Sequence, residues 1–198
     1  LFGPLGFLLF LSFLVHFALA NFESIFGLYA EHRFDYGPQQ VGTIMTVMGL
    51  SSAVVQGVLT GPVTRRWGDL PVIKVSLIAS AVGSALLLLA FDHSTILLTV
   101  GFFVTANAFL RPAITSFVSK QTDEEQGKNM GLVNSYMSLG RVVGPLWAGS
   151  MFDLNITLPY LSAGVVLLVS YLLSLRLLHF GEPVEKALET DPQGISFD

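Results

Sequence analysis

Three polar residues that can do chemistry, His16, Asn21 and Glu23, lie inside an apolar stretch over residues 13–27 (FLVHFALANFESIFG). A carboxylate in hydrocarbon costs about 2.5 kcal/mol or more, so an acid at membrane depth normally faces a protein interior or a water-filled cavity. His16 and Glu23 share one face of a helix, because residues two turns apart are nearly eclipsed. Glu23 is the leading candidate for function, since it could exchange a proton or bind the positive charge of a substrate. The alternative is a structural acid that a neighbouring helix satisfies.

The composition of the chain identifies the class of protein. Hydrophobic residues make up 52% and charged residues 12% of it, and the mean hydropathy is +0.66. These values lie far outside the range of soluble domains, so we expect an integral membrane protein. The sequence has no cysteine, nucleotide-binding loop, metal-ligand cluster or nucleophile–base pair. We therefore expect no cofactor, no metal, no nucleic-acid partner and no enzymatic activity.

Six apolar segments are each near or above the roughly 20 residues that a helix needs to cross a bilayer. They cover residues 4–30, 39–60, 70–91, 94–118, 127–152 and 156–180. Residues 1–180 are thus predicted to form an all-α membrane protein of six transmembrane helices. The acidic tail over 181–198 is predicted to be solvated and mostly disordered. Because the chain begins with Leu1 rather than methionine, we expect it to be part of a longer protein.

Basic residues are distributed unevenly over the connections between these segments, and this asymmetry predicts the orientation of the bundle. The second and fourth connections and the end of the last segment carry most of them, namely Arg65, Arg66, Lys74, Lys120, Lys128, Arg176 and Lys186. We therefore expect a multi-pass protein of the plasma membrane. Its second and fourth connections and its C-terminus would be cytoplasmic.

Polar groups at membrane depth collect on the first, fourth and fifth segments, whereas the third and sixth are almost wholly apolar and suit lipid-facing positions. We expect the first, fourth and fifth segments to line a cavity. Aromatic side chains would add a lining for planar, lipophilic ligands. The residues that we predict to bind substrate are Phe13, His16, Asn21, Glu23, Phe103, Asn107, Arg111, Asn134, Tyr136 and Ser138.

Several of these predictions have a structural alternative. His16 is either a proton relay or a packed histidine with one satisfied nitrogen. Arg111 either fixes a charge near the substrate path or snorkels to the cytoplasmic interface. Arg141 lies in the middle of the fifth segment and needs an acceptor that the sequence does not identify.

Small residues in the fifth segment are spaced for close contact between helices. Gly140 and Gly144 lie one turn apart, as in helix pairs whose backbones approach closely. Pro145 follows directly and is available to bend the helix axis. We expect packing, rather than ligand contact, to be the role of these glycines.

Three stretches carry a resemblance to a known family: NFESIFGLYAEHRFDYGPQQVG, FLRPAITSFVSK and GLVNSYMSLGRVVGPLWAGSMFD. Over residues 5–180 the chain resembles the C-terminal half of a major facilitator superfamily transporter, specifically the NorA-like multidrug and quinolone efflux antiporters of Gram-positive bacteria. The resemblance implies a twelve-helix protein of two pseudo-symmetric halves, each a 3+3 inverted repeat. The partner would then be the N-terminal six-helix half of the same protein.

The resemblance also implies roles for individual residues. Glu23 matches the acidic residue of the seventh helix that is implicated in proton coupling and drug recognition, and Arg111 matches the arginine of the tenth. GPLWAG, which contains Pro145, is similar to the glycine–proline motif of the antiporters. The connection GPVTRRWGD keeps Gly61, Arg66 and Gly68 of the superfamily's loop motif.

The sequence departs from the family pattern at two places. Ala108 stands where close relatives have an aspartate, three residues before the Arg-Pro pair. In the loop motif, Arg65 takes the acidic position and Asp69 a basic one. Proton coupling would therefore depend more on Glu23, or on an acid in the other half.

The expected function is proton-coupled efflux of amphipathic, often cationic drugs such as fluoroquinolones and dyes by alternating access, in a bacterial plasma membrane. The partners would be the lipid bilayer, protons and small-molecule drugs. One alternative is an exporter of a sugar, an amino acid or another metabolite on the same fold. An alternative of another class is a membrane receptor or scaffold module that transports nothing.

Overall fold

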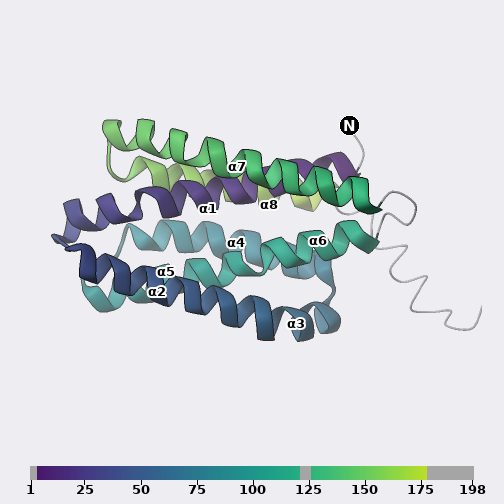
Figure 1. Cartoon of the computed structure of the whole chain (residues 1–198), viewed down its shortest axis with the longest axis horizontal. Helices are drawn as coiled ribbons and strands as arrows, with labels where there is room; N and C mark the ends of the chain where they lie inside the picture. Colours follow the sequence, from purple (N-terminus) through teal and green to yellow (C-terminus); the bar gives the residue numbers. More distant parts are fainter. Residues whose placement is uncertain (1–3, 121–125, 178–198) are drawn as a thin grey trace, which may run out of the picture.

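The computed structural model describes residues 4–120 and 126–177, which are helical with short connections and contain no strand (Figure 1). The helices are α1 (Pro4–Phe34), α2 (Pro38–Val54), the π-helix η1 (Val55–Leu59), α3 (Thr60–Trp67), α4 (Asp69–Leu87), α5 (His93–Ala108), α6 (Leu110–Lys120), α7 (Gln126–Leu154) and α8 (Leu158–Leu177). The predicted acidic tail over 181–198 lies outside the described residues.

These helices combine into membrane-spanning lengths. Five stretches of the described chain are long and apolar enough to cross a membrane: Leu5–Phe34, Pro38–Trp67, Asp69–Leu87, His93–Lys120 and Leu158–Arg176. The second stretch joins α2, η1 and α3, and the fourth joins α5 and α6. The 29-residue α7 is long enough to span but less apolar, since it carries several polar side chains. The prediction of an all-α membrane protein is thus confirmed.

The helices form two layers that meet at α4 (Figure 1). On one side α1 packs against α7 and α8, and on the other α4 packs against α5 and α6, while α8 also contacts α4. The N-terminal end of α1, the junction of α3 with α4 and the C-terminal end of α6 lie at one end of the bundle (Figure 1). Which membrane surface this end faces stays a prediction.

The third apolar segment is more enclosed than its composition suggests. Ser76, Ser80 and Ser84 of α4 are buried, and the Ser84 hydroxyl donates a hydrogen bond of 2.6 Å to the carbonyl of Tyr160 in α8. Only the opposite face, with Val75 and Val82, is exposed. The prediction that this segment faces lipid is therefore wrong for the face that carries the serines, because their hydroxyls pack into the bundle.

Aromatic stacking joins the two layers. The ring centroids of Phe22 in α1 and Phe103 in α5 lie 4.0 Å apart, and the two rings are stacked. Phe22 also meets Tyr160 of α8 edge-on, with 5.1 Å between the ring centroids. All three side chains are fully buried. Since aromatic pairs in such geometries contribute beyond the area that they bury, this cluster fixes α1 against α5 and α8.

The backbones of α1 and α7 approach each other closely at two glycines. A Cβ atom added at Gly140 would lie 2.6 Å from the carbonyl oxygen of Phe13, and one at Gly144 would lie 2.8 Å from that of Phe17. No side chain fits at either position. This close approach explains why both positions are glycine, and it sets the spacing between α1 and α7.

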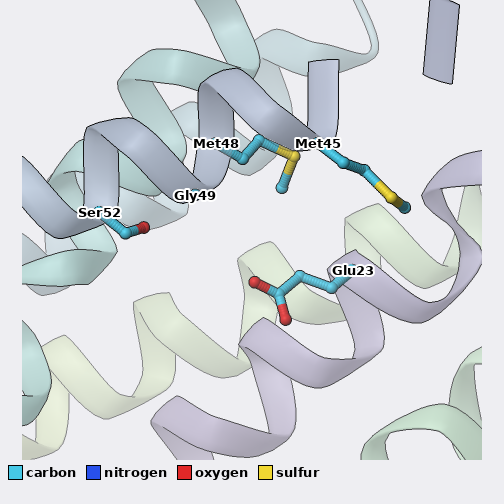
Figure 2. A pocket seen from close by; sticks show the side chains of 5 residues that line it. All are labelled: Glu23, Met45, Met48, Gly49 and Ser52. Carbon is cyan, nitrogen blue, oxygen red and sulfur yellow. The ribbon is translucent and has the colours of Figure 1, made fainter. Parts of the chain in front are cut away.

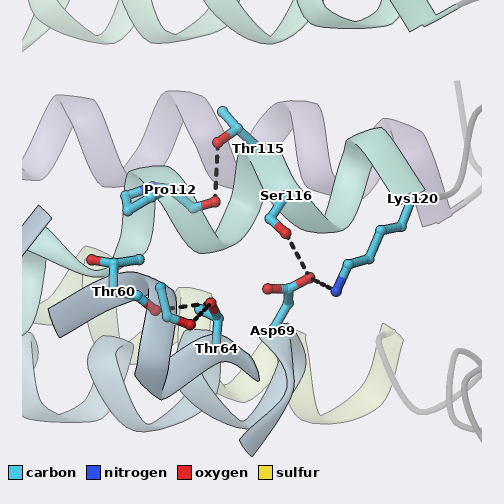
Figure 3. A network of polar contacts seen from close by, with 8 residues as sticks. Thr60, Thr64, Asp69, Pro112, Thr115, Ser116 and Lys120 are labelled. Atoms are coloured by element: carbon cyan, nitrogen blue, oxygen red, sulfur yellow. Dashed lines mark hydrogen bonds and ion pairs between the residues drawn. The ribbon is translucent and has the colours of Figure 1, made fainter. Parts of the chain in front are cut away.

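A buried carboxylate anchors the start of α4. Asp69 directly follows Gly68, whose φ of 80° lies in a region that side-chain-bearing residues rarely adopt. Asp69 is 2% exposed, accepts a 3.0 Å hydrogen bond from Ser116 and lies 2.9 Å from the ammonium group of Lys120 (Figure 3). Through these contacts the junction of α3 with α4 is tied to the C-terminal end of α6.

Replacing Gly140 with alanine is expected to destabilise the full-length protein, because the new methyl group would overlap the backbone of α1. Overpacking of this kind costs about 1–3 kcal/mol. Gly164→Ala is the matched control, since its Cβ would meet its nearest neighbours at an ordinary 3.6 Å. The measurement is the unfolding midpoint of both purified variants in detergent, and equal midpoints would contradict the close approach of α1 and α7.

Replacing Asp69 with alanine is expected to lower the free energy of unfolding by about 1–3 kcal/mol, because Ser116 and Lys120 lose their shared acceptor. Asp153→Ala removes an exposed carboxylate at the end of α7 and serves as the control. Denaturant titration of the full-length protein measures both. If the two variants lose the same stability, the contacts of Asp69 contribute nothing specific.

Candidate functional site

Glu23 lies where two cavities meet. The larger, with a volume of about 330 Å³, is lined by Glu23 together with Met45, Met48, Gly49 and Ser52 of α2. Figure 2 shows the Glu23 side chain pointing from α1 across this cavity toward α2. The methionines give the cavity a flexible, apolar wall, which suits ligands of varied shape. Within the part of the chain that the structure describes, Glu23 is the only ionisable residue that lines this cavity.

The second cavity is smaller and polar. Its volume is about 90 Å³, and it shares Glu23 and Ser52 with the first. The other lining residues come from α1, η1, α5, α6 and α7, and they are Val15, His16, Leu19, Gln56, Val104, Asn107, Ala108, Arg111 and Arg141. One carboxylate therefore faces two guanidinium groups at membrane depth.

Local irregularities of the helices aim two of these side chains at the cavity. Gln56 belongs to the π-helix η1, whose wide turn is closed by the backbone N–H of Thr60, which donates to the Val55 carbonyl. The Thr60 hydroxyl donates a second hydrogen bond of 2.8 Å to the same carbonyl. Single π turns inside α-helices are frequent at functional sites because they shift the side chains beyond them. Arg111 follows the break between α5 and α6 and precedes Pro112, which has no N–H to continue the helix ladder.

Hydrogen bonding within the polar cavity is incomplete. His16 is 3% exposed and its Nδ1 donates to the Ser12 carbonyl at 3.0 Å, which leaves Nε2 as the acceptor of a neutral ring. Asn107 is 4% exposed, and its amide nitrogen has no partner. Within residues 4–120 and 126–177, neither Arg111 nor Arg141 donates a hydrogen bond or forms an ion pair.

The structure brings together four of the ten residues predicted to bind substrate: His16, Glu23, Asn107 and Arg111. Arg141, for which the sequence identified no acceptor, joins them. Arg141 interacts electrostatically with both Glu23 and His16.

The other six predicted residues lie elsewhere. Asn21 is buried against α8, where its amide donates to the Pro159 carbonyl at 3.0 Å and to Ser162 at 3.2 Å. Phe103 is fully buried in the aromatic cluster, and Phe13 stacks between Phe10 and Phe17. Tyr136 packs against the core, whereas Asn134 and Ser138 are exposed on α7. Their assignment to substrate binding stays a prediction that neither cavity supports.

The sequence reasoning missed the contribution of α2 and η1. Met45, Met48, Gly49, Ser52 and Gln56 follow the spacing of one helical face, and they supply one wall of the site. The signal was available, since Ser52 and Gln56 are polar residues inside an apolar segment. They carry no charge, and for that reason they did not stand out beside Glu23.

The loop-motif residues lie away from both cavities. Arg66 is exposed near the C-terminal end of α3, and Gly61 has no atom near the position of its missing Cβ. Gly68 forms the junction of α3 with α4. Pro145 lies inside α7 and is exposed. No group of histidines and carboxylates suited to a metal ion occurs in the described residues.

A cysteine at Gln56 is expected to react with a charged, membrane-impermeant thiol reagent at least about tenfold faster than a cysteine at Ser80, which is buried in α4. The reason is that Gln56 lines a cavity and Ser80 meets only protein. This chain has no cysteine of its own, so it adds no background reaction. Labelling of the full-length protein in membranes provides the measurement, and equal rates would contradict an open polar cavity.

Comparison with known proteins agrees with this architecture. Residues 8–195 match the model of the Major Facilitator Superfamily. The chain is 35% identical over 179 residues to multidrug resistance protein 1 and 33% identical over 167 residues to multidrug resistance protein 2, both of Bacillus subtilis. It is 32% identical over 158 residues to the quinolone resistance protein NorA of Staphylococcus aureus. These alignments cover 79–88% of this chain but only 41–45% of each relative.

Solved structures show the same fold. The human organic anion transporter MFSD10 superposes with a TM-score of 0.78 at 23% identity, over 86% of this chain and 40% of its own. A peptide transporter, POT, gives a TM-score of 0.78 at 17% identity, over 87% of this chain and 37% of its own. The chain thus spans less than half the length of the proteins that it matches, and it belongs to the Major Facilitator Superfamily of membrane transporters.

Proposed function

We propose that this chain is the C-terminal six-helix half of a proton-coupled drug exporter that works by alternating access. The observation that carries the proposal is the position of Glu23 between an apolar, methionine-lined cavity and a polar, arginine-bearing one. An amphipathic molecule needs both environments. The names of the relatives, two multidrug resistance proteins and a quinolone resistance protein, support the same class of substrate.

Proton coupling follows from competition for one carboxylate. When Glu23 is ionised, it attracts the positive charge of an amphipathic drug whose apolar body lies against Met45 and Met48. A proton that enters from outside neutralises Glu23 and weakens this attraction, so the drug leaves. Release of the proton inward restores the carboxylate for the next drug molecule. Each step requires only that Glu23 be reached alternately from the two sides of the membrane.

The N-terminal half would cover the open faces of this bundle. In the most apolar part of the stretch Pro38–Trp67, only 17% of the residues are buried. Its exposed residues include Leu50, Val54 and Val58. Exposed apolar residues also lie along α7, among them Val142 and Leu146. The same two helices also contribute to the cavities, α2 through Ser52 and α7 through Arg141. A substrate path between two halves would therefore be lined here by α1, α2 and α7.

Glu23→Gln is expected to reduce pH-gradient-driven export at least about tenfold, because a neutral amide can neither take up the proton nor attract a cation. The measurement is export of ethidium or a fluoroquinolone by the full-length protein in inverted vesicles, at matched expression. Glu31→Gln is the control, since Glu31 is an exposed carboxylate near the C-terminal end of α1 and lines neither cavity.

The same assay separates the alternatives. Loss of export in Glu23→Gln, with Glu31→Gln unaffected, supports the antiporter. Unchanged export would exclude Glu23 as the essential site. A third outcome is that the wild-type protein exports none of these drugs. Counterflow of sugars or amino acids would then favour a metabolite exporter. Absence of such counterflow would favour a receptor or scaffold.

A further inference from the structure

The charges around the polar cavity do not balance. Glu23 supplies one negative charge, while Arg111 and Arg141 supply two positive charges, and the cavity-lining residues include no second acid. An arginine without a counter-charge at membrane depth is costly and normally has a partner. Within the described ranges neither guanidinium lies at ion-pair distance from an acid, and Glu23 can offset only one of the two positive charges. The cavity is therefore short of one negative group.

Several hydrogen-bond donors that line the cavity also have no acceptor. Both guanidinium groups present only donors. Asn107 adds a buried amide whose nitrogen has no partner, and rotation of such an amide about its last bond exchanges the positions of its donor and its acceptor. Three neighbouring residues thus offer donors to a group that would accept all of them.

We propose that Arg111 and Arg141 form a subsite for the acidic group of the transported drug, most simply a carboxylate. This inference rests on the proposed function and narrows it from amphipathic drugs to zwitterionic ones. A planar carboxylate matches the fork of an arginine and accepts two hydrogen bonds from it. The 90 Å³ cavity holds a group of that size, although it is too small for a whole drug molecule.

The arrangement of the two cavities indicates where the apolar body, the cationic group and the acidic group of such a drug would bind. The apolar body occupies the methionine-lined cavity, whose 330 Å³ is at the lower end of the range for drug-sized ligands. The cationic group lies at Glu23, which borders both cavities, and the acidic group reaches Arg111 and Arg141. Arg141 lies beside Gly140, so the contact between α1 and α7 positions it.

The competing explanation is that an acid elsewhere in the longer protein neutralises Arg141. In that case Arg141 is structural, and its loss would affect all ligands to the same degree. A comparison of ligands that differ only in the acidic group separates the two explanations.

The experiment measures binding to the purified full-length protein, so that it does not depend on successful transport. The probes are a fluoroquinolone with a free carboxylate, its methyl ester and ethidium, and the readout is the dissociation constant of each. The variants are Arg141→Gln, Arg111→Gln and Arg141→Lys. Arg176→Gln, at the exposed end of α8, is the control for removal of a positive charge.

We expect the wild-type protein and Arg176→Gln to bind the free acid about tenfold more tightly than its ester, which corresponds to roughly one charge-assisted hydrogen bond. In Arg141→Gln and Arg111→Gln this ratio should fall toward one, and Arg141→Lys should keep part of it. The inference is overturned if the wild-type protein does not prefer the acid, or if Arg141→Gln weakens acid, ester and ethidium equally. The proposed function would survive either result, because it depends on export driven by a pH gradient.

Discussion

The direct contact between the backbones of α1 and α7 determines how the rest of the site is arranged. Gly140 and Gly144 leave no space for side chains against residues 13–21, so the rotation of α1 about its axis is fixed. With one face of α1 against α7 and another in the aromatic cluster with Phe103, the face that bears His16 and Glu23 must open between α2, α5 and α7. The same contact brings Arg141 to this opening, since it follows Gly140 directly.

The fold class was predictable because it depends on composition and segment length, and both are properties of the sequence. The shared face of His16 and Glu23 was also predictable, since helical spacing alone places them together. Tertiary packing decided the remaining side chains. α1 is apolar nearly all round, so no pattern in it indicates that Asn21 turns toward α8 while Glu23 turns toward α2. Phe103 is an aromatic of the kind that lines drug sites, yet its ring is covered by Phe22.

The contribution of α2 and η1 shows a further limit of sequence reasoning. Ser52 and Gln56 are uncharged, and a helix can carry such side chains at little cost by bonding them to its own carbonyls or to a neighbouring helix. Only the position of α2 across from Glu23 makes them part of a cavity. Charged residues behave differently, because their cost in hydrocarbon forces them toward a partner or toward water. This difference explains why Glu23 and Arg111 were informative in the sequence and Gln56 was not.

Under the proposed function, a site with one carboxylate and two guanidinium groups would couple protons differently to different drugs. Protonation of Glu23 removes the attraction for a cationic group, and it also removes the negative charge that offsets Arg111 and Arg141. A drug with only a positive charge would experience a net loss of attraction and would be released. A zwitterionic drug would lose its contact with Glu23 but would be held more strongly at its acidic end. Competition with the proton would therefore be sharpest for cations, and release of a zwitterion would also require the arginines to move away from its acidic group. Because Arg141 lies on α7, beside the contact with α1, the rocking of the two halves that reopens the site would supply that movement.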